Sequence, residues 1–155
     1  MFKNKSYFIG TGFGIGLIPI VPGTFASLFA LALFFLLPID SNSIWHIPIV
    51  ISLFCIGVWS SNNLSFPENK DPSIVVIDEI TGMWISCLFL PKNSIWIIMA
   101  FILFRFFDIT KIGGIRKLEN LPGGWGIMMD DVFAGILVCT ILNFAIFSDK
   151  FIFWS

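Results

Sequence analysis

Five apolar runs, separated by short connectors that hold most of the charges and prolines, constrain the fold of this 155-residue chain more than any other feature. Only 12% of the residues are charged and the mean hydropathy is +0.92, whereas soluble domains carry roughly 25% charged residues. So little polar sequence cannot cover a water-exposed surface, which excludes the soluble globular and disordered classes. The runs lie at residues 24–37, 44–60, 74–90, 95–107 and 132–147.

The runs are predicted to be helices because they lack the two-residue alternation of strands and because open sheet edges are not tolerated in lipid. A straight span needs about 20 residues, so several shorter runs are expected to be tilted, half-inserted or packed inside a bundle. We therefore predict an all-α fold, a small multi-span membrane bundle of about four to five apolar helices. The length fits a single domain, residues 1–155.

The distribution of lysine and arginine predicts the orientation of the bundle. If the N-terminus lies inside and the runs alternate, seven of these nine residues fall in inside segments, and only Lys92 and Lys150 lie outside. We therefore expect the N-terminus and the charged site on the cytoplasmic side. The net charge of −1 predicts no nucleic-acid partner. The first residues lack the apolar core of a secretory signal, so the first spans are expected to direct insertion.

Local signals predict where helices begin. Thr24 follows Pro22-Gly23, and Asp71-Pro72 has the pattern of an N-cap before a proline in the first helical position. Asp130-Asp131 is expected to open the fifth helix. The glycine-rich segment 10–16 fits no nucleotide-binding motif, and it indicates either a close backbone approach or a turn that presents N–H groups to an anion.

Five carboxylates lie where three predicted helices reach the inside end. Asp78 and Glu79 interrupt the third run, Asp108 ends the fourth, and Asp130 and Asp131 precede the fifth. Acids at membrane depth are costly unless they are paired, hydrated or metal-bound, so they indicate function. Because antiparallel alternation brings the three helix ends to one level, we predict a single cluster. The alternative is an ion-pair network that only orients the helices.

Repulsion within such a cluster is relieved by a divalent cation. Magnesium prefers oxygen ligands and is commonly shared between a few carboxylates and a substrate phosphate. We predict a Mg²⁺ site. Its four principal ligands are Asp78, Glu79, Asp130 and Asp131. Asp108 is either a further ligand or a residue that orients them. Arg105 and Lys111 lie three residues either side of Asp108, on its helix face, and suit the remaining phosphate oxygens.

The chain offers few other nucleophiles for phosphate chemistry. His46 is the only histidine and lies at the opposite end of the second run. None of Cys55, Cys87 and Cys139 begins the Cys-x5-Arg pattern of cysteine phosphatases. Their odd number and apolar surroundings indicate buried thiols. Water activated by a metal is therefore the best candidate, with Glu79 as the candidate general base.

Four motifs resemble the phosphatidylglycerophosphatase A family, which consists of bacterial membrane lipid phosphatases. The matching positions run in order from about residue 8 to 145. They are 12–24 (GFGIGLIPIVPGT), 77–79 (IDE) with Gly82, 104–111 (FRFFDITK), and 123–131 (GGWGIMMDD) with Ala134-Gly135.

The resemblance implies an all-helical protein that hydrolyses phosphatidylglycerophosphate to phosphatidylglycerol and phosphate with Mg²⁺, in the bacterial cytoplasmic membrane. In that reading Arg105 and Lys111 stabilise negative charge on the phosphate. Two other classes remain as alternatives, a cation transporter or channel subunit and a non-catalytic protein that binds anionic lipid. The oligomeric state is not predicted.

Overall fold

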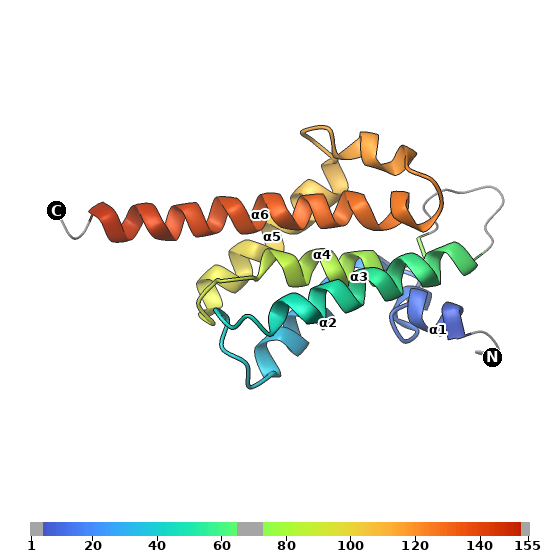
Figure 1. Cartoon of the computed structure of the whole chain (residues 1–155), viewed down its shortest axis with the longest axis horizontal. Coiled ribbons are helices and arrows are strands. Elements are labelled where there is room, and N and C mark those ends of the chain that lie inside the picture. Colours follow the sequence, from blue (N-terminus) through green and yellow to red (C-terminus); the bar gives the residue numbers. More distant parts are fainter. Residues whose placement is uncertain (1–4, 65–72, 153–155) are drawn as a thin grey trace.

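The computed structural model describes residues 5–64 and 73–152, and side chains only as far as residue 148. Every regular element in this part of the chain is a helix, which confirms the all-α prediction (Figure 1). The elements are α1 (Lys5–Gly10), the 3-10 helix η1 (Ile15–Leu17), α2 (Pro22–Leu36), α3 (His46–Asn63), α4 (Ile77–Ser86), α5 (Ser94–Thr110), the 3-10 helix η2 (Ile115–Asn120) and α6 (Gly124–Ile152).

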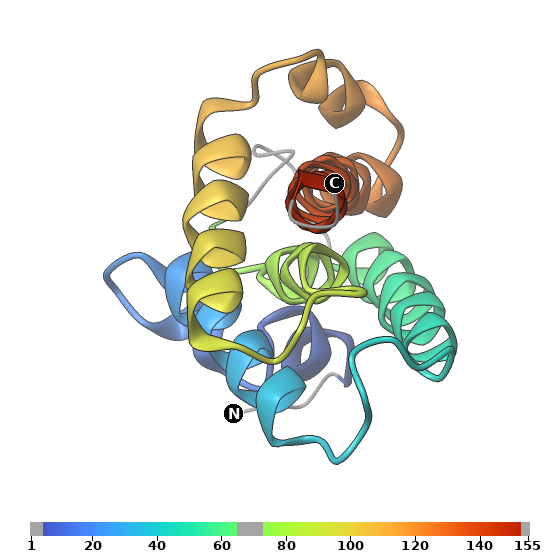
Figure 2. The same ribbon diagram turned by 90° about the vertical axis from the view of Figure 1, so that its left-hand side faces the viewer.

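The short helix α4 forms the centre of the bundle. Figure 2, a view along the long axis, shows α2, α3, α5 and α6 arranged around it. Nine of its ten residues are buried, and the two charged residues of this helix, Asp78 and Glu79, stand in its first turn. The two acids therefore lie inside the molecule rather than on its surface.

The helices alternate in direction, as the sequence predicts. In Figure 1, α2, α4 and α6 begin at the end where α3 and α5 finish. Small residues let α4 and α6 approach closely, because Gly135 lies against the carbonyl oxygen of Gly82 and Gly82 lies against that of Asp131. The acid-bearing ends of α4, α5 and α6 consequently meet.

The predicted number of spans is not confirmed. Among the described residues, α6 is the one helix that is long and apolar enough to cross a membrane, over Gly124–Ser148. Helix α2 is apolar but has 15 residues, and the run 74–90 yields only the ten-residue α4, which is about 15 Å long. A hydrocarbon core is about 30 Å thick, so α4 by itself does not cross one.

Two of the expected helix starts are wrong. Helix α4 begins at Ile77, since residues 73–76 form a turn and two residues without regular structure, where Val76 N donates to Gly10 O at 2.9 Å. Asp71-Pro72 lies outside the described residues. Helix α6 begins at Gly124, whose N–H donates to Asn62 Oδ1 at 2.7 Å. Asp130-Asp131 therefore lies almost two turns inside α6 and does not open it.

The start of α2 differs by only two residues from the prediction. Pro22 occupies the first turn of the helix, and the preceding Val21 takes a left-handed conformation with φ 45°. Proline suits this position because its missing N–H would have no partner inside the helix.

Candidate active site

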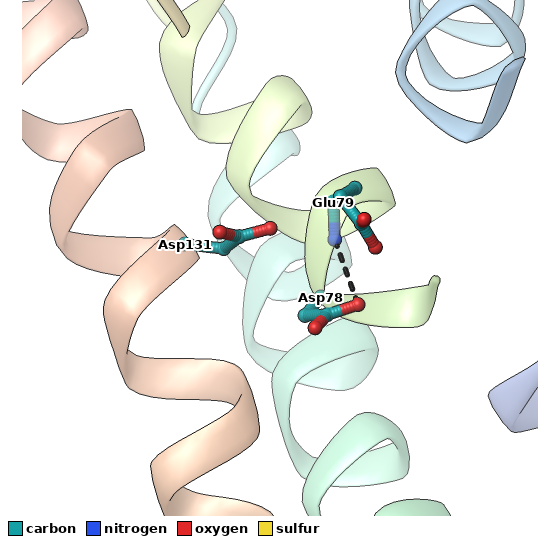
Figure 3. Close-up of side chains that lie close together, drawn as sticks. All are labelled: Asp78, Glu79 and Asp131. Carbon is teal, nitrogen blue, oxygen red and sulfur yellow. Dashed lines mark hydrogen bonds between the residues drawn. The ribbon is translucent and has the colours of Figure 1, made fainter. Parts of the chain in front are cut away.

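Three carboxylates from two helices converge in the interior. One oxygen from each of Asp78, Glu79 and Asp131 lies within 4.8 Å of those of the other two. In Figure 3 the Asp131 side chain reaches from α6 toward α4, and Asp78 Oδ1 accepts a hydrogen bond of 3.1 Å from the Glu79 N–H. Asp78 and Asp131 are only 5% and 3% exposed, and Glu79 is half-buried.

The other two predicted acids border this trio. The Asp131 side chain lies within hydrogen-bonding distance of Asp108 and within electrostatic range of Asp130. Asp130 is buried and accepts a hydrogen bond of 2.5 Å from Lys111 Nζ. The structure thus brings all five acids into one neighbourhood, but it separates Asp130 from the compact trio by turning it toward a lysine.

Both predicted cations lie at the same place. Arg105 forms an ion pair with Asp108 one turn later on α5. Its Nε is buried and has no hydrogen-bond partner among the described residues, so an anion oxygen is a suitable acceptor for it. Lys111 bridges Asp130 and Glu119, with its Nζ 2.6 Å from Glu119 Oε1.

Sequence reasoning did not place Glu119 in the site. It reaches Lys111 because α5 ends there, with Lys111 in a left-handed conformation at φ 50°, and η2 then folds back over the start of α6. The only sequence signal for this reversal is the glycine pair Gly113-Gly114, both at positive φ.

The start of α2 forms a further wall of the site. A methyl group on Gly23 would collide with Glu79 Oε1 and lie 3.1 Å from Arg105 Nη1, so a larger residue here would displace these two side chains. In the preceding segment, Gly16 lies against the carbonyl oxygen of Ile74. Gly16 therefore serves a close approach of two backbone segments.

The donor set suits a hard divalent cation. Three carboxylates gathered within 4.8 Å repel one another, and oxygen ligands of this kind fit magnesium. His46 lies apart, stacked on Phe34 with its Nε2 3.1 Å from Asp40 O, and it does not reach the acids. Among the described residues, the site therefore offers a ligand carboxylates and two cations, and no histidine.

Comparison with known proteins identifies the family of the chain. Residues 8–146 match the family model described as Phosphatidylglycerophosphatase A. Proteins named "Phosphatidylglycerophosphatase A" from Escherichia coli and Haemophilus influenzae are 36% and 38% identical, each over 92% of this chain and over 84% and 89% of their own lengths. A Bacteroides thetaiotaomicron protein named "Putative phosphatidylinositol-3-phosphatase" is 48% identical over 83% of this chain and 85% of its own.

No solved structure matches the chain. The family model nevertheless spans the described elements from α1 into α6 and includes every acid and cation of the site. On the combined evidence of this match and the named relatives, the chain belongs to the phosphatidylglycerophosphatase A family.

Proposed function

We propose that the chain is a magnesium-dependent lipid phosphatase that hydrolyses phosphatidylglycerophosphate to phosphatidylglycerol and phosphate. The observation that carries the proposal is the convergence of Asp78, Glu79 and Asp131 beside Arg105. The whole chain has few charged residues, so this gathering of charge is marked. The names of the bacterial relatives support the substrate.

The three converging carboxylates are proposed to hold the metal. A bound magnesium ion would supply positive charge to the phosphate and lower the pKa of a water molecule. Asp108 keeps its place through Arg105 and adjoins Asp131, which suits an orienting role or that of a further ligand. Asp130 is paired with Lys111, which favours an orienting role for Asp130 over direct ligation of the metal.

The remaining steps are proposed for side chains of the chain itself. Glu79 is the best candidate to accept the proton of the attacking water, because it is half-buried whereas Asp78 and Asp131 are buried. Arg105 offers its Nε–H to a phosphate oxygen, and Lys111 adds positive charge beside Asp130. Together they would stabilise the charge that develops as the P–O bond to the glycerol breaks.

The protein is proposed to lie in the bacterial cytoplasmic membrane as a multi-pass bundle, with this site at the cytoplasmic headgroup level. Large apolar side chains are exposed on each outer helix, including Leu36 on α2, Ile51 on α3, Ile102 on α5 and Phe144 on α6. Such a surface suits lipid better than water. The charges gathered at one end of the bundle would then meet the headgroups, while the acyl chains of the substrate stay in the bilayer.

Phosphate release from the purified protein in detergent tests the function. The assay compares phosphatidylglycerophosphate, phosphatidylinositol 3-phosphate and phosphatidic acid, each with magnesium and with EDTA. We expect fastest release from phosphatidylglycerophosphate and none with EDTA. The name of the Bacteroides relative makes the inositol lipid the specific competitor, and faster release from it would replace the proposed substrate.

A further inference from the structure

A shallow basic cavity, open to the surface, lies at the turn between α5 and η2. Its volume is about 570 Å³, and its lining holds three cations and no acid. The residues around it are Thr110, Lys111, Ile112, Gly114, Arg116, Lys117 and Asn120. None of the roles proposed above uses Arg116 or Lys117.

The two outer cations of this cavity are available to a ligand. Arg116 and Lys117 are exposed, and within residues 5–64 and 73–152 neither forms an ion pair. The third cation of the cavity, Lys111, is bound to two acids. Positive charge that is not neutralised by the protein, in a concave place, attracts anions.

The cavity adjoins the catalytic acids through Lys111. This side chain lines the cavity, and its Nζ bonds Asp130, the neighbour of Asp131. A ligand seated against Arg116 and Lys117 would therefore share the Lys111 side chain with Asp130. That arrangement suits a molecule that carries two phosphates a few bonds apart.

Exposed apolar residues near the cavity suit a lipid boundary. Ile112 in the lining is 52% exposed, and Ile109, one turn back on α5, is 68% exposed. Exposed isoleucines next to cations match the level where acyl chains meet headgroups.

We propose that this cavity binds the phosphodiester group of the lipid headgroup while the terminal phosphate monoester lies at the carboxylate cluster. The proposal rests on the proposed function and deepens it, because it assigns Arg116 and Lys117 to recognition of the substrate headgroup. Phosphatidic acid, which has only the monoester, cannot fill the cavity in this way.

Steady-state kinetics in neutral detergent micelles test the assignment, with the double variant Arg116→Gln/Lys117→Gln against wild type. Loss of both charges is expected to raise the KM for phosphatidylglycerophosphate about tenfold with kcat within about twofold, because these cations contact the headgroup and not the reacting phosphorus. Arg116→Lys is expected to stay close to wild type. Lys5→Gln is the matched control, since it removes one exposed charge from α1 at the same end of the bundle.

Binding of dihexanoyl phosphatidylglycerol gives a readout that does not need turnover. This lipid carries the phosphodiester alone, and its affinity for the protein, measured by calorimetry, should fall about tenfold in the double variant and stay unchanged in Lys5→Gln. Unchanged KM and unchanged affinity in the double variant would overturn the assignment while leaving the phosphatase activity intact. Inorganic phosphate that binds with the same affinity and the same dependence on Arg116 would overturn it in favour of a free-phosphate site.

Discussion

Replacement of Gly82 by alanine tests whether the close crossing of α4 and α6 sets the geometry of the site. A methyl group there would lie 2.6 Å from the carbonyl oxygen of Asp131 and 2.6 Å from Phe104 Cε2, whereas ordinary contacts begin at 3.4 Å. One of these neighbours is backbone and the other belongs to a fully buried ring, so neither yields easily. The two helices would have to separate by about 0.8 Å to restore normal contacts.

That separation acts directly on the carboxylates, because Asp78 and Glu79 belong to α4 and Asp131 to α6. A displacement near 1 Å can lower a rate by about 10²-fold, and overpacking of a core costs about 1–3 kcal/mol of stability. We therefore expect Gly82→Ala to lose about 10²-fold in kcat, to require more magnesium for half-maximal activity and to unfold at lower temperature in detergent.

The matched control is Gly57→Ala in α3. A methyl group at this position meets the flexible end of Met128 rather than backbone, so the side chain can move aside. Activity of this variant should stay within about threefold of wild type. Wild-type rate and magnesium requirement in Gly82→Ala would show that the crossing does not hold the acids in place.

Three further predictions follow from single contacts. Asp131→Asn should lose about 10²-fold or more in phosphate release with an unchanged circular dichroism spectrum, and a rate near wild type would remove this residue from the mechanism. Lys111→Met should lower both activity and stability, the latter by about 1–3 kcal/mol in thermal unfolding, because Asp130 and Glu119 lose their shared cation, and Lys111→Arg should recover part of both. Asn62→Ala should cost about 1 kcal/mol of stability, because the N–H of Gly124 loses its acceptor at the start of α6, and an unchanged unfolding midpoint would contradict that role.

The helical class could be predicted from the apolar runs, which lack the alternation of strands, and the gathering of the acids could be predicted from their cost in an apolar chain. In a chain with 12% charged residues, every acid inside an apolar run must have a compensating environment, and the acids of three runs share one. The structure accordingly places Asp78, Glu79 and Asp131 together and sets Asp108 beside them.

The parts that sequence reasoning missed depend on tertiary packing. The run 74–90 is continuous in hydropathy, yet its first residues are not helical, and Val76 bonds the backbone of Gly10, a contact between distant segments. The ion pair of Lys111 with Glu119 requires the chain reversal at Gly113-Gly114, and the contact of Gly23 with Glu79 requires the fold of the whole bundle. Hydrophobic periodicity along one segment carries no information about such contacts.

Binding of Mn²⁺, a spectroscopic substitute for magnesium, tests the central claim most directly, since the claim is that acids of α4 and α6 form one metal site. Electron paramagnetic resonance of the purified protein in detergent measures the affinity for Mn²⁺ without substrate. We predict that wild type binds the ion and that Asp78→Asn in α4 and Asp131→Asn in α6 each weaken binding about tenfold or more. Binding that is equal in wild type and both variants would contradict the shared site.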